Sequence, residues 1–365
     1  MLYAFCDEFL AISDQRELRQ KHHSSFGPIS RDDIHNSRPT SEPAKMTPVP
    51  VVNQTKSVNG LRKSNVWAVV VTHNPTSDFE QNVRDLAPQV DELVIVDNQS
   101  SPVIRQFIEK VASAHNTKAI WGQQNLGIAS ALNAGIDLAL ASSECRWILM
   151  LDQDSHVPPD FVATMFDAYE ACAFKDEVAL IGANYQLVFR TLQPPSPAGN
   201  TPAKEVKTLM TSGTLAKRTV FTDCGSFDES FFMDYVDHEF CFRVRRHGLR
   251  IIQAKNAILQ HRLGSPTLHR MFGRPFITAN YSAIRRYHQA RNRLIFYRRY
   301  LYTDTKWIVC DCFRWFREIL KVMVVEPDRR NKLASIARGV RDGLVQIGQA
   351  AKAPTRGSKS LHKTD

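Results

Sequence analysis

The sequence has 365 residues, 43% of them hydrophobic and 23% charged, which is the composition of an ordinary globular protein. Its uninterrupted apolar runs are far shorter than a bilayer span, so no transmembrane helix is predicted. The acidic Asp7 and Glu8 in the first apolar stretch argue against a signal peptide. The seven cysteines are scattered and include no CxxC pair, which favours the cytoplasm over a disulfide framework or a zinc cage.

The net charge of +10 comes from the C-terminal part of the chain. Residues 262–365 hold 22 Lys and Arg against 7 Asp and Glu, whereas residues 1–261 hold 25 against 30. A basic surplus of this kind suits nucleic acid, a nucleotide diphosphate or an anionic membrane surface. A solvated charged face is the alternative interpretation.

Residues 1–64 lack sustained periodicity, which predicts a mobile N-terminal extension. The run Val-Trp-Ala-Val-Val-Val-Thr at 66–72 then predicts a buried strand. Alternating elements follow: strands are expected at 92–97, 118–121 and 147–152, and helices near 78–90, 101–115 and 128–141. This alternation predicts an α/β domain with a mostly parallel sheet and helices on both faces. Beyond residue 178 the pattern is irregular, with a Pro-rich loop, and beyond about 277 it is helical.

Polar side chains follow three of the predicted strands. They are Thr72-His73-Asn74, Asp97-Asn98 and Asp152-Gln153-Asp154. Ligands of parallel sheets bind at the carboxyl ends of the strands, so these residues are expected to converge on one pocket.

The spacing of Asp152 and Asp154 after a buried strand can hold a hard divalent cation, which would neutralise a diphosphate. Capping of a helix that starts near Pro158 is the structural alternative.

A second acidic group lies in an aromatic stretch between Gly225 and Arg243, and it includes Asp237 and Glu239. A carboxylate beside apolar side chains has the raised proton affinity of a general base. The alternative is helix capping together with pairing to Arg243.

Residues 261–300 contain nine Arg and no acid, interleaved with aromatic residues, which suits nucleotide diphosphate or nucleic acid. The acidic motifs would repel a polyanion, which disfavours nucleic acid. The segment from Trp307 to Glu326 has apolar residues at helical spacing beside Arg314, Arg317 and Lys321. This amphipathic helix suits either a membrane interface or packing on the domain.

Together these segments resemble the inverting family 2 glycosyltransferases of the GT-A fold, and within them the bacterial rhamnosyltransferases of polysaccharide and O-antigen assembly. The resemblance spans about residues 66–300. The motifs that carry it are Val70 to Pro75, Val96 to Ser100, Asn125 to Ala129 with Leu132 to Gly135, Leu151 to Ser155, Thr211 to Gly213, Gly225 to Glu229, Asp234 to Arg243, and Arg291-Asn292.

The resemblance implies a role for each matching residue. Thr72, Asn74, Asp97, Asn125, Asp152 and Arg291 would bind the nucleotide sugar, and Asp154, with His261, would approach Mg²⁺ or Mn²⁺. Asp237 would be the general base, although Val236 replaces the acid that often precedes it, which leaves Glu239 as an alternative base. A structural role is the alternative for His261.

The resemblance also implies partners and boundaries. The donor would be dTDP-L-rhamnose, with galactofuranose, glucose or N-acetylhexosamine donors as alternatives, and the acceptor a hydroxyl of a saccharide or lipid-linked saccharide. The enzyme is expected in the cytoplasm, peripheral on an anionic membrane, and a nucleic-acid-binding protein is the remote alternative. The expected regions are a disordered extension at 1–64, a GT-A domain at 65–300 with a mostly parallel mixed sheet flanked by helices, basic amphipathic helices at 301–350 and a disordered tail at 351–365.

Overall fold

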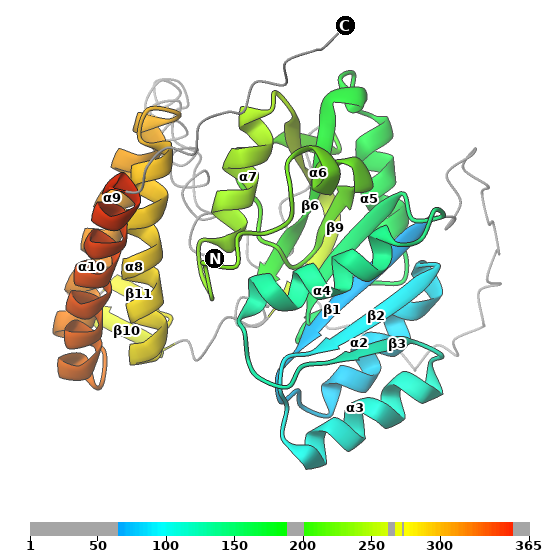
Figure 1. Ribbon diagram of the computed structural model, residues 1–365, viewed down its shortest axis with the longest axis horizontal. Helices are drawn as coiled ribbons and strands as arrows, with labels where there is room; N and C mark the ends of the chain where they lie inside the picture. Colours follow the sequence, from blue (N-terminus) through cyan, green and yellow to red (C-terminus); the bar gives the residue numbers. More distant parts are fainter. Residues whose placement is uncertain (1–64, 188–200, 262–266, 272–273, 353–365) are drawn as a thin grey trace, which may run out of the picture. The chain divides into compact units, whose positions relative to one another are not determined.

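The computed structural model describes residues 65–187, 201–261, 267–271 and 274–352 (Figure 1). The predicted extension at 1–64, most of the Pro-rich loop and the tail beyond residue 352 lie outside the described residues.

Four parallel strands form the first half of a nine-stranded sheet, in the order β3-β2-β1-β4. Their bounds agree with the prediction: β1 (Val66–Thr72), β2 (Glu92–Asp97), β3 (Lys118–Trp121) and β4 (Trp147–Asp152). Every residue of β1 is buried, because helices cover both faces of the sheet here.

Helices alternate with these strands as predicted. They are α2 (Asp78–Leu86), the 3₁₀ turn η1 (Ala87–Gln89), α3 (Pro102–Ala114), α4 (Ile128–Leu140), α5 (Phe161–Glu170) and the 3₁₀ turn η2 (Lys175–Glu177). Ala68 and Val70 of β1 join the main apolar core with α2, α3 and α5. Val69 points to the other face, where Gly135 of α4 lies so close that a Cβ would be 2.4 Å from Val69 Cγ1. Alternate residues of one strand thus anchor two helical layers.

The second half of the sheet is mixed. Its strands are β5 (Ser155–His156), β6 (Val178–Leu187), β7 (Ala203–Glu205), β8 (Thr214–Lys217) and β9 (Arg250–His261). Strand β8 is antiparallel to both β4 and β6, and β6 is parallel to β9. The mixed sheet that the resemblance implied is therefore present, and its second half lies where the sequence pattern is irregular. Register shifts near Ala179 and Ala183 interrupt the two-residue period by which strands are recognised in a sequence.

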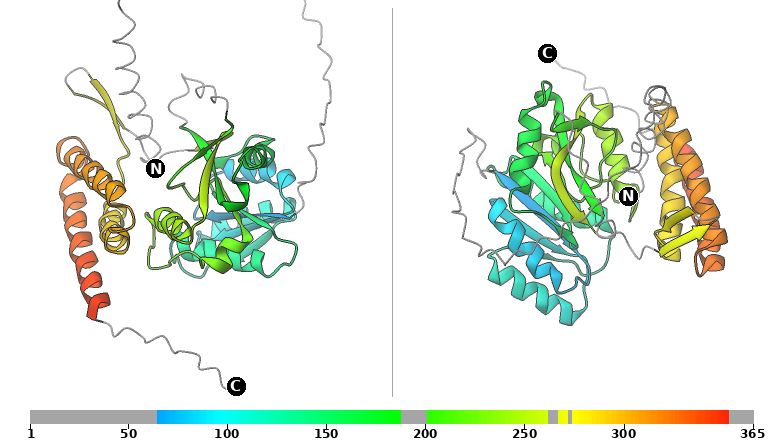
Figure 2. Two further views of the ribbon diagram at one scale, coloured as in Figure 1. Left: turned by 90° about the horizontal axis from the view of Figure 1, so that it is seen from above. Right: turned by 180° about the vertical axis from the view of Figure 1, so that it is seen from behind.

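Helices dominate the remainder of the chain, as predicted. They are α6 (Arg218–Asp223), α7 (Val236–Arg246), α8 (Ala283–Tyr300), α9 (Thr305–Val324) and α10 (Arg329–Lys352), with a hairpin of β10 (Thr267–Met271) and β11 (Arg274–Thr278) before α8. Helix α10 runs along α8 (Figures 1 and 2), and its Gly339 lies where a Cβ would come within 2.4 Å of the Tyr287 carbonyl. Close backbone approach therefore fixes this helix pair.

Helix α9 confirms the predicted amphipathic helix but turns its apolar stripe outward. Trp307 and Ile308 are buried, whereas Val309, Phe313 and Phe316 are 60%, 66% and 57% exposed. Packing on the domain explains Trp307 and Ile308 but not the exposed residues. For the rest of the apolar stripe, packing on the domain was therefore the wrong interpretation. Among the described residues, no helix is both long enough and apolar enough to cross a membrane.

Candidate active site

The site has two parts, which we name the donor side (the ends of β1, β2 and β4) and the base side (the turn at residues 233–235 and the start of α7). On the donor side, Thr72 and Asp97 are register partners in β1 and β2, and the Thr72 hydroxyl donates to Asp97 Oδ1 over 3.4 Å. The Ser100 N–H donates to both Asp97 oxygens, at 3.2 and 3.1 Å. Asp97 is 1% exposed, so these donors fix the orientation of its carboxylate.

The loops around this carboxylate are held by asparagine side chains. Asn74 Oδ1 accepts from the Ser101 N–H at 2.8 Å, at the start of α3. Asn98 Nδ2 donates to Asn125 Oδ1 at 3.0 Å, and Asn98 Oδ1 accepts from the Leu126 N–H at 3.1 Å. Asn74 and Asn125 thus lie in the loops that surround Asp97, as the strand-end argument requires.

Gly127 connects the donor side to the base side. Its φ is +89°, and a Cβ there would lie 2.3 Å from the carbonyl oxygen of Phe232. The next residue, Ile128, donates its N–H to that same carbonyl at 2.9 Å. Only glycine meets both requirements, since left-handed backbone is strained for other residues.

The D-Q-D motif begins at Asp152, the last residue of β4, and both its acidic residues are partly exposed. The Asp152 N–H donates to Ser212 Oγ at 3.0 Å, and the Tyr185 hydroxyl donates to the Ser212 carbonyl at 2.9 Å. Between the two acids, Gln153 Oε1 accepts from the His73 N–H at 2.7 Å. Backbone and neutral side chains therefore hold the motif in place.

The oxygen ligands of the D-Q-D motif suit a divalent cation that binds together with a substrate diphosphate. No group of three or more His, Cys, Asp or Glu side chains arranged to bind a metal occurs in the described part of the chain. Asp152 and Asp154 offer carboxylate oxygens, and the backbone of His261 pairs with Ser155, the residue after Asp154. Magnesium sites are commonly completed by substrate phosphates and water, so two carboxylates suit a cation that binds with a diphosphate.

Asp237 lies in the first turn of α7, where the positive end of the helix dipole favours a carboxylate. Its side chain is 21% exposed. Asp237 Oδ1 accepts from the His238 N–H at 2.8 Å and lies 3.4 Å from His238 Nδ1. Burial lowers the pKa of His238 below its usual value, and the Asp237 carboxylate opposes that shift. Asp237 is therefore a partly accessible carboxylate beside a neutral imidazole.

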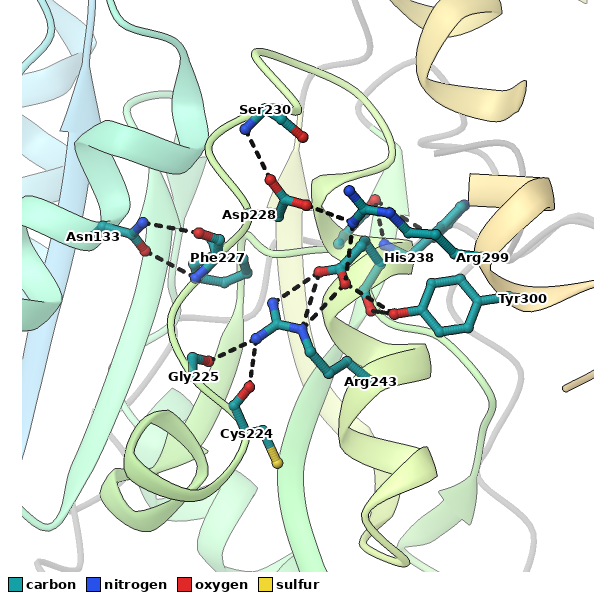
Figure 3. Close-up of polar contacts among 12 residues, drawn as sticks. Asn133, Cys224, Gly225, Phe227, Asp228, Ser230, His238, Arg243, Arg299 and Tyr300 are labelled. Carbon is teal, nitrogen blue, oxygen red and sulfur yellow. Dashed lines mark hydrogen bonds and ion pairs between the residues drawn. The ribbon is translucent and has the colours of Figure 1, made fainter. Parts of the chain in front are cut away.

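Glu239 has a different environment. Its carboxylate is 4% exposed, accepts from Arg243 Nη2 at 2.8 Å and accepts from the Tyr300 hydroxyl at 2.9 Å. Arg243 also donates to the carbonyls of Cys224 and Gly225, at 2.6 and 3.0 Å (Figure 3). This network ties α7 to the loop at 224–232. It accounts for Glu239 structurally and leaves Asp237 as the predicted base.

Tyr185 of β6 joins the two sides electrostatically. Burial raises the pKa of its phenol well above the usual value, and the nearby carboxylates of Asp237 and Asp152 raise this pKa further. The candidate base and the D-Q-D motif thus both lie near this half-buried tyrosine. Their roles were predicted from segments 85 positions apart in the sequence.

Helix α8 contributes cations to this region. Arg285 donates to Asp234 through Nε and Nη2, both at 3.0 Å, and the carboxylates of Asp234 and then Asp152 raise its pKa. Arg291, which the sequence favoured, donates to the Ser230 carbonyl. The adjacent Asn292 donates to the carbonyls of Met233 and Asp234, at 2.7 and 3.0 Å.

Tyr185, Ser212 and Arg285 were not predicted as individual site residues. Ser212 is part of the Thr211-Ser212-Gly213 motif, which offered a signal. Arg285 is one of nine arginines in its segment, and only the three-dimensional structure distinguishes it. Tyr185 lies in the strand that the sequence pattern concealed.

The class that this sheet and its acidic strand ends define is the GT-A glycosyltransferases. Within that class, residues 67–220 match the family model described as Glycosyl transferase family 2. The chain therefore carries a family 2 glycosyltransferase domain and is a glycosyltransferase, which confirms the resemblance found in the sequence.

Two characterised relatives are similar to the chain. It is 28% identical to "dTDP-rhamnosyl transferase RfbF" of Shigella flexneri over 253 residues, which cover 65% of this chain and 81% of the relative. It is 23% identical to "Low-salt glycan biosynthesis hexosyltransferase Agl10" of Haloferax volcanii over 232 residues, which cover 57% and 70%.

Solved structures are more distant. The S. aureus TarS fragment 1–349 in complex with UDP-GlcNAc is 15% identical, with a TM-score of 0.44, over 80% of this chain and 76% of that one. GalNAc-T7 with UDP, GalNAc and Mn²⁺ is 13% identical, with a TM-score of 0.46, over 57% of this chain and 44% of that one.

Proposed function

We propose that this glycosyltransferase moves L-rhamnose from dTDP-L-rhamnose to a hydroxyl of a saccharide or lipid-linked saccharide, with inversion at the anomeric carbon. The similarity to the dTDP-rhamnosyl transferase supports the donor. The observation that supports the reaction type is a partly exposed carboxylate on each side of the site, Asp237 in the first turn of α7 and Asp152 at the end of β4. One acid stands at the base side and one at the donor side, as a single displacement requires.

In the proposed step, Asp237 removes the proton of the acceptor hydroxyl while that oxygen bonds to the anomeric carbon. The bond from this carbon to the diphosphate oxygen breaks, and the bonding pair leaves with the diphosphate. Attack from the face opposite the leaving group inverts the centre. The ion pair of Glu239 with Arg243 keeps α7 in place while Asp237 takes the proton.

Two groups would balance the charge of the departing diphosphate. When bound to Asp154 and Asp152, a divalent cation supplies Lewis-acid stabilisation of that charge. The protein's own counter-charge would come from α8, where the Arg291 guanidinium donates to a neutral carbonyl, that of Ser230, and Arg285 is paired with Asp234. The role of His261 near the cation remains a prediction.

The donor is tested by thermal shift with a panel of nucleotide sugars in Mg²⁺ or Mn²⁺. At 100 times its Kd, the correct donor stabilises the fold by about 2.7 kcal/mol. We expect the largest rise in melting temperature with dTDP-L-rhamnose. A larger rise with UDP-galactofuranose, UDP-glucose or UDP-N-acetylhexosamine would transfer the proposal to that donor.

The base is tested by Asp237→Asn, with Glu239→Gln as the matched acid two positions away. Asp237→Asn should lower kcat by about 10²–10⁴-fold with donor affinity retained, because proton removal contributes in the transition state. Glu239→Gln should mainly lower the melting temperature. Normal kcat in Asp237→Asn with collapse of kcat in folded Glu239→Gln would assign the base to Glu239.

The cation is tested by Asp154→Ala. We expect this variant to stay folded and to lose both turnover and the added stability that Mg²⁺ or Mn²⁺ gives in the presence of donor. Full turnover in excess chelator would exclude the cation, and loss of folding would indicate a structural role for Asp154. Capping of the next helix, the sequence alternative, is not that role, because α5 begins at Phe161 with Asp160 at its N-cap.

We further propose that the outward stripe of α9 binds the surface of an anionic membrane. Its exposed members are Val309, Phe313, Phe316, Leu320 and Met323, at alternating spacings of four and three. Exposed Lys306 and Arg317 accompany the stripe, and residues 283–352 hold sixteen Lys and Arg against six Asp and Glu. Apolar and cationic groups on one helix suit an anionic interface.

The test is sedimentation with vesicles of phosphatidylglycerol and phosphatidylcholine, compared with phosphatidylcholine alone. We expect binding to the anionic vesicles, release at roughly 0.5 M salt through screening, and loss of binding in Phe313→Ser/Phe316→Ser. Leu344→Ser, at an exposed apolar residue of α10, is the control and should bind normally. Indifference to anionic vesicles, or a dimer that the double substitution abolishes, would overturn this assignment.

A further inference from the structure

The turn that precedes α7 has an unusual backbone. Asp234 and Tyr235 are consecutive residues with φ of 59° and 66°, in the left-handed region. Side chains other than glycine are strained in this region, and such conformations persist only where surrounding contacts enforce them. Asp237 is the second residue of the helix that follows, so this turn sets the direction from which its carboxylate approaches the site.

Helix α8 enforces the first half of the turn. Arg285 forms two 3.0 Å hydrogen bonds with the Asp234 carboxylate. Two turns further along the same helix, Asn292 donates to the carbonyls of Met233 and Asp234. These contacts hold the side chain and the backbone of Asp234, but none of them reaches Tyr235, whose left-handed conformation leads directly into the helix.

Helix α9 provides a hydrogen-bond partner for the Tyr235 hydroxyl, while Phe296 and Arg293 of α8 contact the ring. Asp311 is 0% exposed, and its Oδ2 accepts from the Tyr235 hydroxyl at 2.5 Å and from the Tyr297 hydroxyl at 2.6 Å. Arg293 Nε donates to the same oxygen at 3.0 Å, which compensates the buried charge. Burial, and then the Asp311 carboxylate, raise the pKa of Tyr297, so this phenol remains a proton donor at neutral pH.

We infer that Asp311, acting through Tyr235, is a positioning residue for Asp237. The inference rests on the proposed role of Asp237 as general base. The hydrogen bond from Tyr235 to Asp311 holds the second left-handed residue and hence the first turn of α7. Without it, Tyr235 can relax toward negative φ and move the Asp237 carboxylate. A displacement of about 1 Å in a reacting group can lower the rate by about 100-fold.

The pair Tyr235→Phe and Tyr297→Phe separates positioning from stability. Each substitution removes one phenol hydroxyl from the same Asp311 oxygen and leaves Arg293 paired, but only Tyr235 adjoins the turn. We expect Tyr235→Phe to lower kcat by about 10–100-fold, with unchanged donor KM and a shifted acidic limb of the kcat–pH profile. Tyr297→Phe should cost similar thermal stability and keep kcat within about threefold. Asp311→Asn should reproduce the Tyr235→Phe profile, although it also leaves Arg293 without its charge partner.

Normal kcat in Tyr235→Phe, or equal losses of kcat in the two phenylalanine variants, would overturn the inference. Asp237→Asn is measured in parallel to distinguish this failure from failure of the proposed function. If Asp237→Asn is inactive while Tyr235→Phe is normal, only the positioning role fails. If Asp237→Asn is fully active, both fail, whatever Tyr235→Phe does.

Discussion

The donor side and the base side of the site are held by contacts of different range along the chain. On the donor side, Thr72 bonds to Asp97 and Asn98 to Asn125, over 25 and 27 positions. On the base side, Asp234 bonds to Arg285 over 51 positions and Tyr235 to Asp311 over 76. Adjacent β-α units build the first side, whereas helices from the end of the chain complete the second.

This difference indicates what each side needs in order to form. Around Asp97, the donor side requires only that neighbouring parallel strands pair, since its side chains follow those strands directly. The D-Q-D motif also needs Ser212, 60 positions from Asp152. The base side requires α8 and α9 to pack in place, because side chains of these two helices bind its strained turn at residues 233–235. Helix α9, which the sequence assigned to an appendage after residue 300, therefore contributes contacts to the candidate site.

The largest effect should come from breaking the largely buried ion pair of the base side. Glu239→Ala leaves Arg243, whose side chain is 20% exposed, without its carboxylate partner. Loss of one partner of a largely buried pair costs about 3–5 kcal/mol. We expect a loss of that size in the free energy of unfolding, measured by urea denaturation.

Glu80→Ala is the control for this experiment. Glu80 pairs with Arg84 one turn away on α2, and both side chains are largely exposed. Pairs of this kind contribute about 0.3–0.5 kcal/mol. If the two variants lost similar stability, the buried network of Glu239, which includes the Tyr300 hydroxyl 61 positions away, would not stabilise the base side as we argue.

A smaller effect is expected from Asp97→Asn on the donor side. Hydrogen bonds to a charged group contribute about 1.5–3 kcal/mol, so the donor Kd should rise by about 10–100-fold if Asp97 binds the nucleotide. Titration calorimetry with the donor measures this change.

The matched control is Asp91→Asn at the other end of β1. Asp91 Oδ2 also accepts two backbone N–H groups, from Asn65 and Val66, at 2.7 and 2.9 Å. The Asp91→Asn substitution should leave the donor Kd within about twofold of the unsubstituted protein. An equal rise in both variants would mean that Asp97 acts through stability rather than through contact with the donor.

The same contrast in range explains what the sequence could predict. Residues 66–152 supply clear periodicity, and each of the four strands predicted there has the bounds of the observed strand. Strand β6 was missed because its register shifts against β9 break the alternation of side chains. Asp237 and Glu239 had similar local sequence contexts, and the structure separates them by the pairing of Glu239 with Arg243 and by its distant partners Tyr300 and Arg299.

The smallest effect concerns pH and a histidine of the base side. His238 is 4% exposed, and burial lowers its pKa below the ordinary value of about 6.5, although the Asp237 and Asp311 carboxylates oppose the shift. The positive charge of Arg293 acts in the same direction as burial. His238 is therefore neutral in the folded protein at pH 7.

As the pH falls through 6.5, the unfolded chain binds a proton at His238 before the folded chain does, so the free energy of unfolding decreases. This loss continues until the pH reaches the lower pKa of the folded state. We expect the melting temperature to fall between pH 7.5 and 5.5, and to fall less steeply in His238→Gln. The comparison uses the slope with pH, because the substitution also changes packing at every pH. Parallel slopes in the two proteins would show that folding does not lower the pKa of His238.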